Sequence, residues 1–388
     1  MILAGLGTLA QPATACQYRT FTTMGMGMSQ VDRVEPFFHN GEAPPPAAIV
    51  RHRPAFTGNA TEFFGIWIVN LVLSVLTLGI YSAWAKVRTQ RYFYANTRLV
   101  DAPFEYLADP IAILKGRLIA YAVVITLAVG FKLQAFWLVI PLYLLVFAAL
   151  PFLVCMGLRF RARYSAWRGL RFRFDGTVGE AYTAYLWLPI ASLFTLNLLL
   201  PYVVCRQHAY MMGNHAYGRK RFSYSGEAGS YYTPFLISLG MAIGLFVLML
   251  SLLTAGIASG TEGMGAKGMG LAVVGLVYGG MFAIGVYLRA RWLNLMWNNT
   301  RMGEHRIECR VQARRLAWIY LSNGVVILCT LGLAVPWAMV RTLRYRLECI
   351  ELLVQGTIDE IQADGSRDTT STGAEMVDAL DMDMDIAL

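Results

Sequence analysis

The stretch NLVLSVLTLGIYSAWAKVRTQRY (residues 70–92) decides how the chain is organised, because it occurs more than once. A shift of 253 residues superposes it on NGVVILCTLGLAVPWAMVRTLRY (residues 323–345). A shift of 118 residues finds a weaker copy that ends in TLNLLLPYVVCRQHAY (residues 195–210). We call these the TLG segments, after their shared Thr-Leu-Gly, although the weak copy has Asn197 instead of glycine. The first and third copies share Asn70/Asn323, Thr77/Thr330, Gly79/Gly332, Trp84/Trp337, Arg88/Arg341 and Arg91/Arg344, and the second copy keeps Thr195 and Arg206.

The composition indicates a membrane protein. Hydrophobic residues make up 56% of the chain and charged residues only 15%, whereas a soluble domain carries about 25% charged residues. Continuous apolar runs long enough to cross a bilayer lie near residues 64–84, 117–133, 135–158, 183–205, 234–257, 269–288 and 316–337. The pattern therefore predicts an all-α polytopic membrane protein, built from repeated TLG segments and transmembrane helical hairpins.

Short polar segments between the apolar runs predict surface β-ribbons. WRGLRFRFDGTVGEAY (residues 167–182) is an example, because it combines β-prone aromatic residues with a glycine turn. The predicted repeat unit is a TLG segment, a ribbon, a hairpin and a second ribbon. The predicted organisation is a disordered or mis-annotated N-terminal extension (1–53), a repeated membrane domain (54–355) with TLG segments at 64–92, 183–210 and 316–345 and hairpins at 117–158 and 234–288, and an acidic cytoplasmic tail (356–388).

The charge distribution bears on topology. The net charge is +9, but residues 351–388 hold ten acids and one arginine, which is −9 and leaves +18 for the remainder. The positive-inside rule then places both hairpin turns outside and both flanks of every TLG segment inside. A single crossing does not satisfy this arrangement. Either the TLG segments re-enter on the side they left, or they cross normally and some basic loops lie outside.

No catalytic, cofactor-binding or metal-ligating pattern stands out. A GxGxxG match at residues 263–268 opens an apolar helix, whereas a dinucleotide site requires a preceding strand. The five histidines lack ligand spacing, and the apolar runs contain no paired acids. Orientation in the membrane accounts for the basic excess, so we expect no nucleic-acid partner.

Two sets of residues are candidates for other roles. The repeated tryptophans and arginines of the TLG segments are either interfacial anchors or ligands for lipid phosphate groups, and both interpretations stay open. The hairpin at 234–288 carries GxxxG in both arms, a spacing that lets helices approach closely. Its glycines are Gly240, Gly244, Gly275 and Gly279.

The segments TLGIYSAWAKVRTQRYFYANTRL, YSAWRGLRFRFDGTVGEAY and TLGLAVPWAMVRTLRY resemble the YjgN family, which has no assigned function. The resemblance covers roughly residues 54–355. It implies a multi-pass protein of the bacterial cytoplasmic (inner) membrane, and it supplies no activity, substrate or catalytic residue.

Three functions remain compatible with the sequence. The first is a non-enzymatic module that binds lipid or assembles in the membrane. The second is a transporter or channel for a neutral or amphiphilic solute, and the third is a membrane-embedded enzyme. The expected partners are the lipid bilayer, anionic lipid headgroups, and a second copy or another membrane protein.

Overall fold

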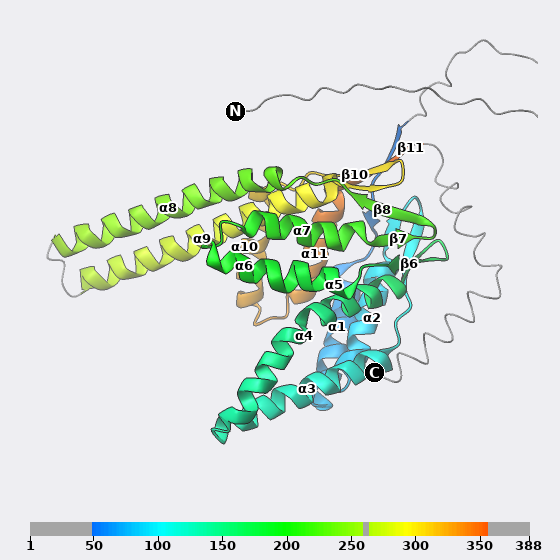
Figure 1. Cartoon of the computed structure of the whole chain (residues 1–388), viewed down its shortest axis with the longest axis horizontal. Coiled ribbons are helices and arrows are strands. Elements are labelled where there is room, and N and C mark those ends of the chain that lie inside the picture. Colours follow the sequence, from blue (N-terminus) through cyan, green and yellow to red (C-terminus); the bar gives the residue numbers. More distant parts are fainter. Residues whose placement is uncertain (1–48, 259–263, 356–388) are drawn as a thin grey trace, which may run out of the picture. The chain divides into compact units, whose positions relative to one another are not determined.

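The computed structural model describes residues 49–258 and 264–355, and one pattern recurs along them (Figure 1). Two antiparallel helices are followed by one or two short strands, and we call each such group a unit. Strands β1 (Ile49–His52) and β2 (Ala55–Phe56) precede unit 1. Unit 1 comprises α1 (Ala60–Leu76), α2 (Ser82–Ala95), β3 (Thr97–Leu99) and β4 (Ala102–Tyr106), and unit 2 comprises α3 (Pro110–Lys132), α4 (Phe136–Arg163), β5 (Ser165–Trp167) and β6 (Leu170–Phe174). Unit 3 comprises α5 (Val178–Tyr182), the π-helical η1 (Thr183–Trp187), α6 (Leu188–Phe194), α7 (Leu200–Gly213), β7 (His215–Tyr217) and β8 (Lys220–Tyr224). Unit 4 comprises α8 (Ala228–Ala258), α9 (Met264–Asn298), β9 (Thr300–Met302) and β10 (His305–Cys309), and unit 5 comprises α10 (Ala313–Cys329), α11 (Val335–Glu348) and β11 (Ile350–Gln355).

The strands of the described chain form one antiparallel sheet in the order β1-β11-β10-β9-β8-β7-β6-β5-β4-β3-β2. Only Arg53 and Pro54 separate the two edge strands, β1 and β2, so the chain itself links both edges. The all-α fold class is therefore wrong. The predicted surface ribbons are not separate connectors, because each joins its neighbours edge to edge. Local sequence patterns do not reveal this pairing, since successive partners such as β4 and β5 are separated by a whole pair of helices.

One backbone hydrogen bond closes the base of every helical pair. The N–H of the residue three positions before the pair's first helix donates to the carbonyl of the residue that follows its second helix. In the described residues these bonds are Thr57 to Asn96, Leu107 to Tyr164, Asp175 to Asn214, Ser225 to Asn299 and Arg310 to Cys349, each 2.9 Å. Every pair therefore leaves the sheet and returns to it at the same place.

Successive units also pack side by side. The second helix of each unit packs against the first helix of the next, and α11 of unit 5 packs against α1 of unit 1. Side chains reinforce this order by reaching the backbone that precedes the next unit. Arg91 donates to Ala108 O (3.4 Å), Arg159 to Gly176 O (2.9 Å), Asn294 to Val311 O (2.9 Å) and Arg344 to Gly58 O (3.2 Å). The last contact joins the end of the series to its start.

The TLG segments are helical pairs that reverse at the Thr-Leu-Gly sequence. Gly79 and Gly332 have φ angles of 90° and 91°, and Asn197 has a φ of 62°. Glycine adopts this left-handed region without steric cost, and asparagine adopts it more readily than most residues. The weak copy therefore keeps the same turn although it lacks the glycine.

The repeated threonine holds the TLG turn together. Thr77 Oγ1 donates to Leu73 O (2.7 Å) and accepts from the Tyr81 N–H (2.9 Å). Thr330 makes the equivalent bonds to Val326 O (2.8 Å) and from the Ala334 N–H (3.0 Å). The hydroxyl thus supplies an acceptor to the N–H at the start of the second helix, and it also binds a carbonyl near the end of the first helix that accepts from the threonine N–H.

The long pairs belong to units 2 and 4. Among the described residues, four helices are long and apolar enough to cross a membrane: Pro110–Lys132, Phe136–Arg163, Ala228–Gly256 and Lys267–Asn298. Figure 1 shows α8 and α9 lying side by side along their length. Helices of the TLG segments have at most 17 residues. Long and short pairs therefore alternate along the chain.

The α8–α9 contact does not use the GxxxG glycines. A Cβ added at Gly240, Gly244, Gly275 or Gly279 meets no atom within 4 Å. The close approach lies at Gly280 instead, where an added Cβ would be 2.5 Å from Leu245 Cδ2. These four glycines thus face open space, and a role for them in helix packing stays a prediction.

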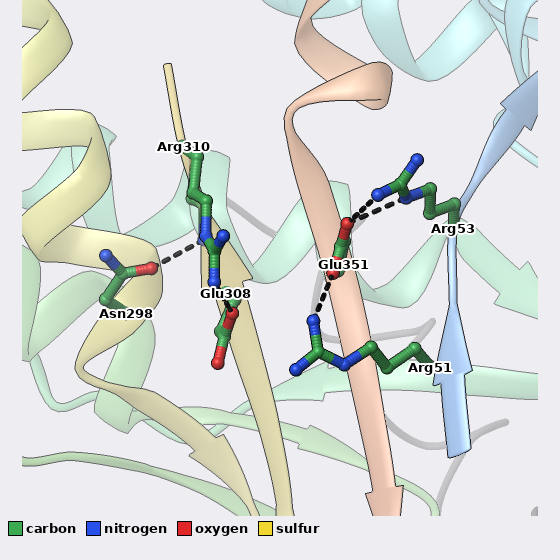
Figure 2. A network of polar contacts seen from close by, with 7 residues as sticks. Arg51, Arg53, Asn298, Glu308, Arg310 and Glu351 are labelled. Carbon is green, nitrogen blue, oxygen red and sulfur yellow. Dashed lines mark hydrogen bonds and ion pairs between the residues drawn. The ribbon is translucent and has the colours of Figure 1, made fainter. Parts of the chain in front are cut away.

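Most of the predicted N-terminal extension and the acidic tail lie outside the described residues. Strand β1 begins at Ile49, within the segment 1–53, and it pairs only with β11 in the described chain. Glu351 of β11 lies between Arg51 and Arg53 (Figure 2). Arg53 Nε donates to Glu351 Oε1 at 2.7 Å, and Arg51 Nη1 lies 3.5 Å from Oε2. These ion pairs hold the first strand at the edge of the sheet.

The left-handed glycine of the TLG turn can be tested by substitution. Gly332→Ala should lower the free energy of unfolding by about 1–2 kcal/mol, because a Cβ disfavours the left-handed backbone. No atom lies within 4 Å of the new Cβ, so the effect isolates backbone strain. Gly324→Ala in the adjoining helix α10 is the matched control and should stabilise by roughly 0.5–1 kcal/mol. The thermal midpoint in detergent measures both, and equal shifts would contradict the assignment.

The ion pairs of Glu351 predict a pH effect at β1. The hydrogen bond from Arg53, together with the charges of Arg53, Arg51 and Arg310, lowers the pKa of Glu351 below its usual value. Its contribution to stability is therefore complete above the unfolded pKa of about 4.3 and is lost as the pH falls through the lower folded value. Glu351→Gln should reproduce this loss at pH 7 as faster amide hydrogen exchange across residues 49–52. Unchanged exchange would show that the β1–β11 backbone pairing alone holds the strand.

Candidate ligand-binding cavity

Alternation along the strands gives the sheet one apolar and one basic face. In β6, Leu170, Phe172 and Phe174 are buried or half-buried, while Arg171 and Arg173 are exposed. The same alternation in neighbouring strands collects apolar side chains on one side of the sheet. Together they form a buried cluster of Trp167, Leu170, Tyr217, Met302, Ile307, Leu352 and Val354.

This apolar face borders a cavity of about 1190 Å³. Strands β3 to β11 supply part of the lining, and helices α2, α4, α9, α10 and α11 supply the rest. Aromatic rings dominate the strand side. The ring centroids of Phe104 and Trp167 lie 6.1 Å apart, and those of Trp167 and Tyr217 lie 5.6 Å apart. Such a wall favours an apolar ligand or the apolar part of an amphiphile.

Few charged groups reach the cavity. Among its described lining residues, Arg161 and Arg346 carry charge and there is no carboxylate. Arg346 Nη2 donates to Tyr320 Oη (3.0 Å), while its Nε is buried without a hydrogen-bond partner in the described chain. Burial lowers the pKa of His215, although its hydrogen-bond contact with Met211 O acts in the opposite direction. His215 is therefore neutral at pH 7, and the lining is net positive.

The candidate residues of the TLG segments occupy structural positions in the hairpins. The Asn70 side chain donates to Ala85 O, and that of Asn323 donates to Ala338 O, both at 3.4 Å. Each bond ties the first helix of a pair to the second. Thr77, Gly79, Thr195, Thr330 and Gly332 belong to the turns, whereas Arg91 and Arg344 bind the backbone that precedes the next unit. Asn323 additionally lines the cavity.

The repeated arginines at the helix edge differ from copy to copy. Arg341 donates to Ser322 Oγ (2.8 Å) and Asn323 Oδ1 (3.0 Å), and it lies 5.0 Å over the Trp337 ring. Arg88 and Arg206 are exposed, as is Trp84. Asn70 Oδ1 is buried without a partner in the described residues, so Arg88 does not reproduce the bond that Arg341 makes. Arg341 therefore supports the fold, and Arg88 is free to contact solvent or lipid.

Sequence reasoning did not identify the aromatic wall of the cavity. The alternation in segments such as LRFRF was visible, but it indicated a ribbon at the surface rather than a shared interior. No local signal shows that these ribbons face one another, because their partners come from other units. Within the described chain no group of three or more His, Cys, Asp or Glu residues comes together to hold a metal ion.

The chain matches the model of a family described as a bacterial protein of unknown function, DUF898, over residues 51–379. The chain belongs to this family. Its curated relatives include inner membrane protein YjgN of Salmonella typhimurium, 31% identical over 145 residues that make up 37% of each chain. YjgN of Escherichia coli O157:H7 is 29% identical over 143 residues, which cover 36% of this chain and 35% of that protein. The resemblance to YjgN is thus confirmed.

These matches span little more than a third of the curated relatives' length. No solved structure matches the chain. The relatives are inner membrane proteins, and four helices of the described residues are long and apolar enough to cross a membrane. The protein is therefore a multi-pass protein of the bacterial inner membrane.

The two aligned arginines should respond differently to truncation. Arg341→Ala should cost about 1–3 kcal/mol of stability, because it leaves the buried Asn323 Oδ1 without its donor. Arg88→Ala should change stability by less than about 0.5 kcal/mol, as is usual for exposed positions. Thermal unfolding of both variants in one detergent makes the comparison. Equal losses would mean that Arg88 also supports the fold.

Proposed function

We propose that this protein is a non-enzymatic lipid-binding module that holds the apolar part of an amphiphile in its central cavity. The observation that carries the proposal is the cavity of about 1190 Å³, whose largely apolar wall is built by residues from all units. Small-molecule sites usually measure about 300–1,000 Å³. A volume at or above this range suits an alkyl chain better than a small polar solute.

The chemistry of the wall favours the same ligand class. Each methylene group moved from water into an apolar site contributes about 0.8 kcal/mol, so an alkyl chain gains affinity along its length. The rings of Phe104, Trp167 and Phe222 offer a neutral solute few hydrogen bonds. Positive groups at the lining add a preference for an anionic head over a cationic one.

The polar groups at the cavity support binding rather than catalysis. Ser165 is a hydroxyl in the lining, but its Oγ contacts Tyr94 Oη at 3.0 Å and donates to Arg161 O at 2.8 Å. His215 also lines the cavity, but its Nδ1 contacts Met211 O at 2.5 Å rather than the hydroxyl of Ser165. A nucleophile needs an adjacent general base, and neither contact supplies one.

The orientation of the module follows from the closed bases of the helical pairs. All helical pairs start and finish at the sheet, and the strand turns and the sheet's outer face are rich in arginine. The positive-inside rule therefore assigns the sheet to the cytoplasmic side.

Filling the cavity tests the proposal. Gly324 lines the cavity, and a Cβ added there meets no atom within 4 Å. Gly324→Phe adds a ring at the cavity wall and should lower the lipid that co-purifies in mild detergent several-fold. Gly65→Phe is the matched control, because Gly65 is an exposed helical glycine with equally open surroundings outside the cavity.

Quantitative mass spectrometry of extracted lipid per mole of protein gives the readout. Loss of lipid in Gly324→Phe but not in Gly65→Phe supports the cavity as the binding site. The proposed function would be refuted if wild-type protein carried no more lipid per mole than the background that remains after detergent exchange.

A further inference from the structure

One face of α2 runs along the edge of the cavity and meets two other helices. Ser82, Lys86, Gln90 and Tyr94 are spaced by four residues, so they lie on the same side of this helix. Contacts at both ends of this stripe fix its neighbours. Arg117 of α3 donates to Ser82 Oγ, and Tyr94 Oη contacts Ser165 Oγ of β5.

Arg161 of α4 completes the arrangement. Arg161 lines the cavity, as Gln90 and Tyr94 do, and both Arg161 and Arg117 lie close enough to Lys86 for their charges to act on its amine. Lys86 is one helical turn from Ser82, where Arg117 binds, and one turn from Gln90. Three cations from three helices, Lys86, Arg117 and Arg161, therefore gather at one edge of the cavity. We call them the cationic cluster.

The residues that the structure describes supply no counter-charge to the cationic cluster. Partial desolvation and the charges of Arg117 and Arg161 lower the pKa of Lys86, so the groups repel one another. In the described chain none of the three forms an ion pair with a carboxylate. Other arginines do find acids, as Arg53 does with Glu351 and Arg173 with Asp175. Bringing like charges together costs free energy that a bound anion would offset.

The depth of the cationic cluster matches a lipid headgroup. Arg117 lies seven residues after the start of α3, and Arg161 lies two residues before the end of α4. At 1.5 Å per residue, Arg117 is roughly 10 Å from the sheet end of its helix, where a membrane-spanning helix passes the headgroup region. Guanidinium groups bind phosphate oxygens through two parallel hydrogen bonds. Basic pockets between membrane helices are known to hold such groups.

We propose that Lys86, Arg117 and Arg161 bind the phosphate of an anionic lipid whose alkyl chains extend into the cavity. The placement of the chains rests on the proposed function, whereas the phosphate site rests on the cationic cluster itself. Only Arg161 belongs to both the cluster and the cavity lining. The site would discriminate by charge, and the cavity would retain any lipid with suitable chains.

The experiment compares lipid classes rather than total lipid. Protein is extracted from membranes that hold a fixed mixture of phosphatidylglycerol and phosphatidylethanolamine, and the two classes are counted per mole of protein. The wild type should enrich phosphatidylglycerol several-fold over the membrane. Lys86→Gln and Arg117→Gln should abolish this enrichment while total lipid stays close to the wild-type amount, and Lys86→Arg should retain it.

A matched control removes one positive charge from the helix that carries Arg117. Lys115→Gln lies two residues from Arg117 on α3, and Lys115 is exposed, as Lys86 is. Enrichment should persist in this variant. If the control loses it as fully as the cluster variants, net charge is responsible and the site is refuted. Thermal midpoints near that of the wild type show that the variants fold.

The remaining outcomes separate the two proposals and the two sources of phosphate. If the wild type retains lipid but does not enrich phosphatidylglycerol, the phosphate site alone is overturned. If the wild type retains no lipid, the proposed function is overturned. Equilibrium dialysis of delipidated protein with inorganic phosphate provides the second arm. Stoichiometric binding of phosphate that Lys86→Gln removes, with no enrichment of phosphatidylglycerol, would assign the cluster to free phosphate and overturn the lipid.

Discussion

The hydrogen bond at the base of each helical pair is the constraint on which the fold depends. It joins the residue that enters a pair to the residue that leaves it, at 2.9 Å in each unit of the described chain. Because the base is fixed, the helices above it vary in length without disturbing the sheet. Helices of 14 residues in unit 1 and 35 residues in unit 4 therefore share one connection. This freedom explains how short and membrane-spanning pairs alternate on one scaffold.

The same constraint produces the cavity. Strands of two to six residues have little stability by themselves, so each depends on the strand and helices of the next unit. The series of five units closes on itself through two contacts: Arg344 donates to Gly58 O, and β1 pairs with β11. Apolar side chains from strands of units 2 to 5 then form one shared cluster. The large rings of Trp167 and Tyr217 pack with one another there, yet they leave about 1190 Å³ unfilled.

The sequence predicted the features that single residues impose and missed those that arise from pairing. Thr77, Gly79 and their copies were visible because a left-handed turn with a capped end tolerates few residue types. Tyr92, Tyr210 and Tyr345 recur for a similar reason, since each hydroxyl donates to the carbonyl just before the pair, in Asn59, Thr177 and Gln312. The long pairs of units 2 and 4 lack the Thr-Leu-Gly sequence, although the α3–α4 turn also contains a left-handed residue, Gln134 with a φ of 53°. Their kinship with the TLG segments lies in the backbone bond, which any residue can make.

The candidate site was hidden for the same physical reason. Lys86, Arg117 and Arg161 come from three helices, and each alone is an ordinary basic residue at the end of an apolar run. The aromatic residues of the cavity wall come from strands in different units, such as Phe104 of β4 and Phe222 of β8. By contrast, the identical Arg88 and Arg341 drew attention, although of the two only Arg341 makes side-chain hydrogen bonds within the part of the chain that the structure describes.

The reversal at the TLG turns removes the conflict between charge and topology. Both flanks of each TLG segment are basic, and both return to the sheet, so no single crossing is required. The leucines at the three turns point away from the fold: Leu78, Leu196 and Leu331 are 93%, 87% and 95% exposed. Leucines presented in this way avoid an unfavourable exposure to water when the tips lie in hydrocarbon. Short pairs that enter the bilayer from the sheet side satisfy the basic flanks and the apolar tips together.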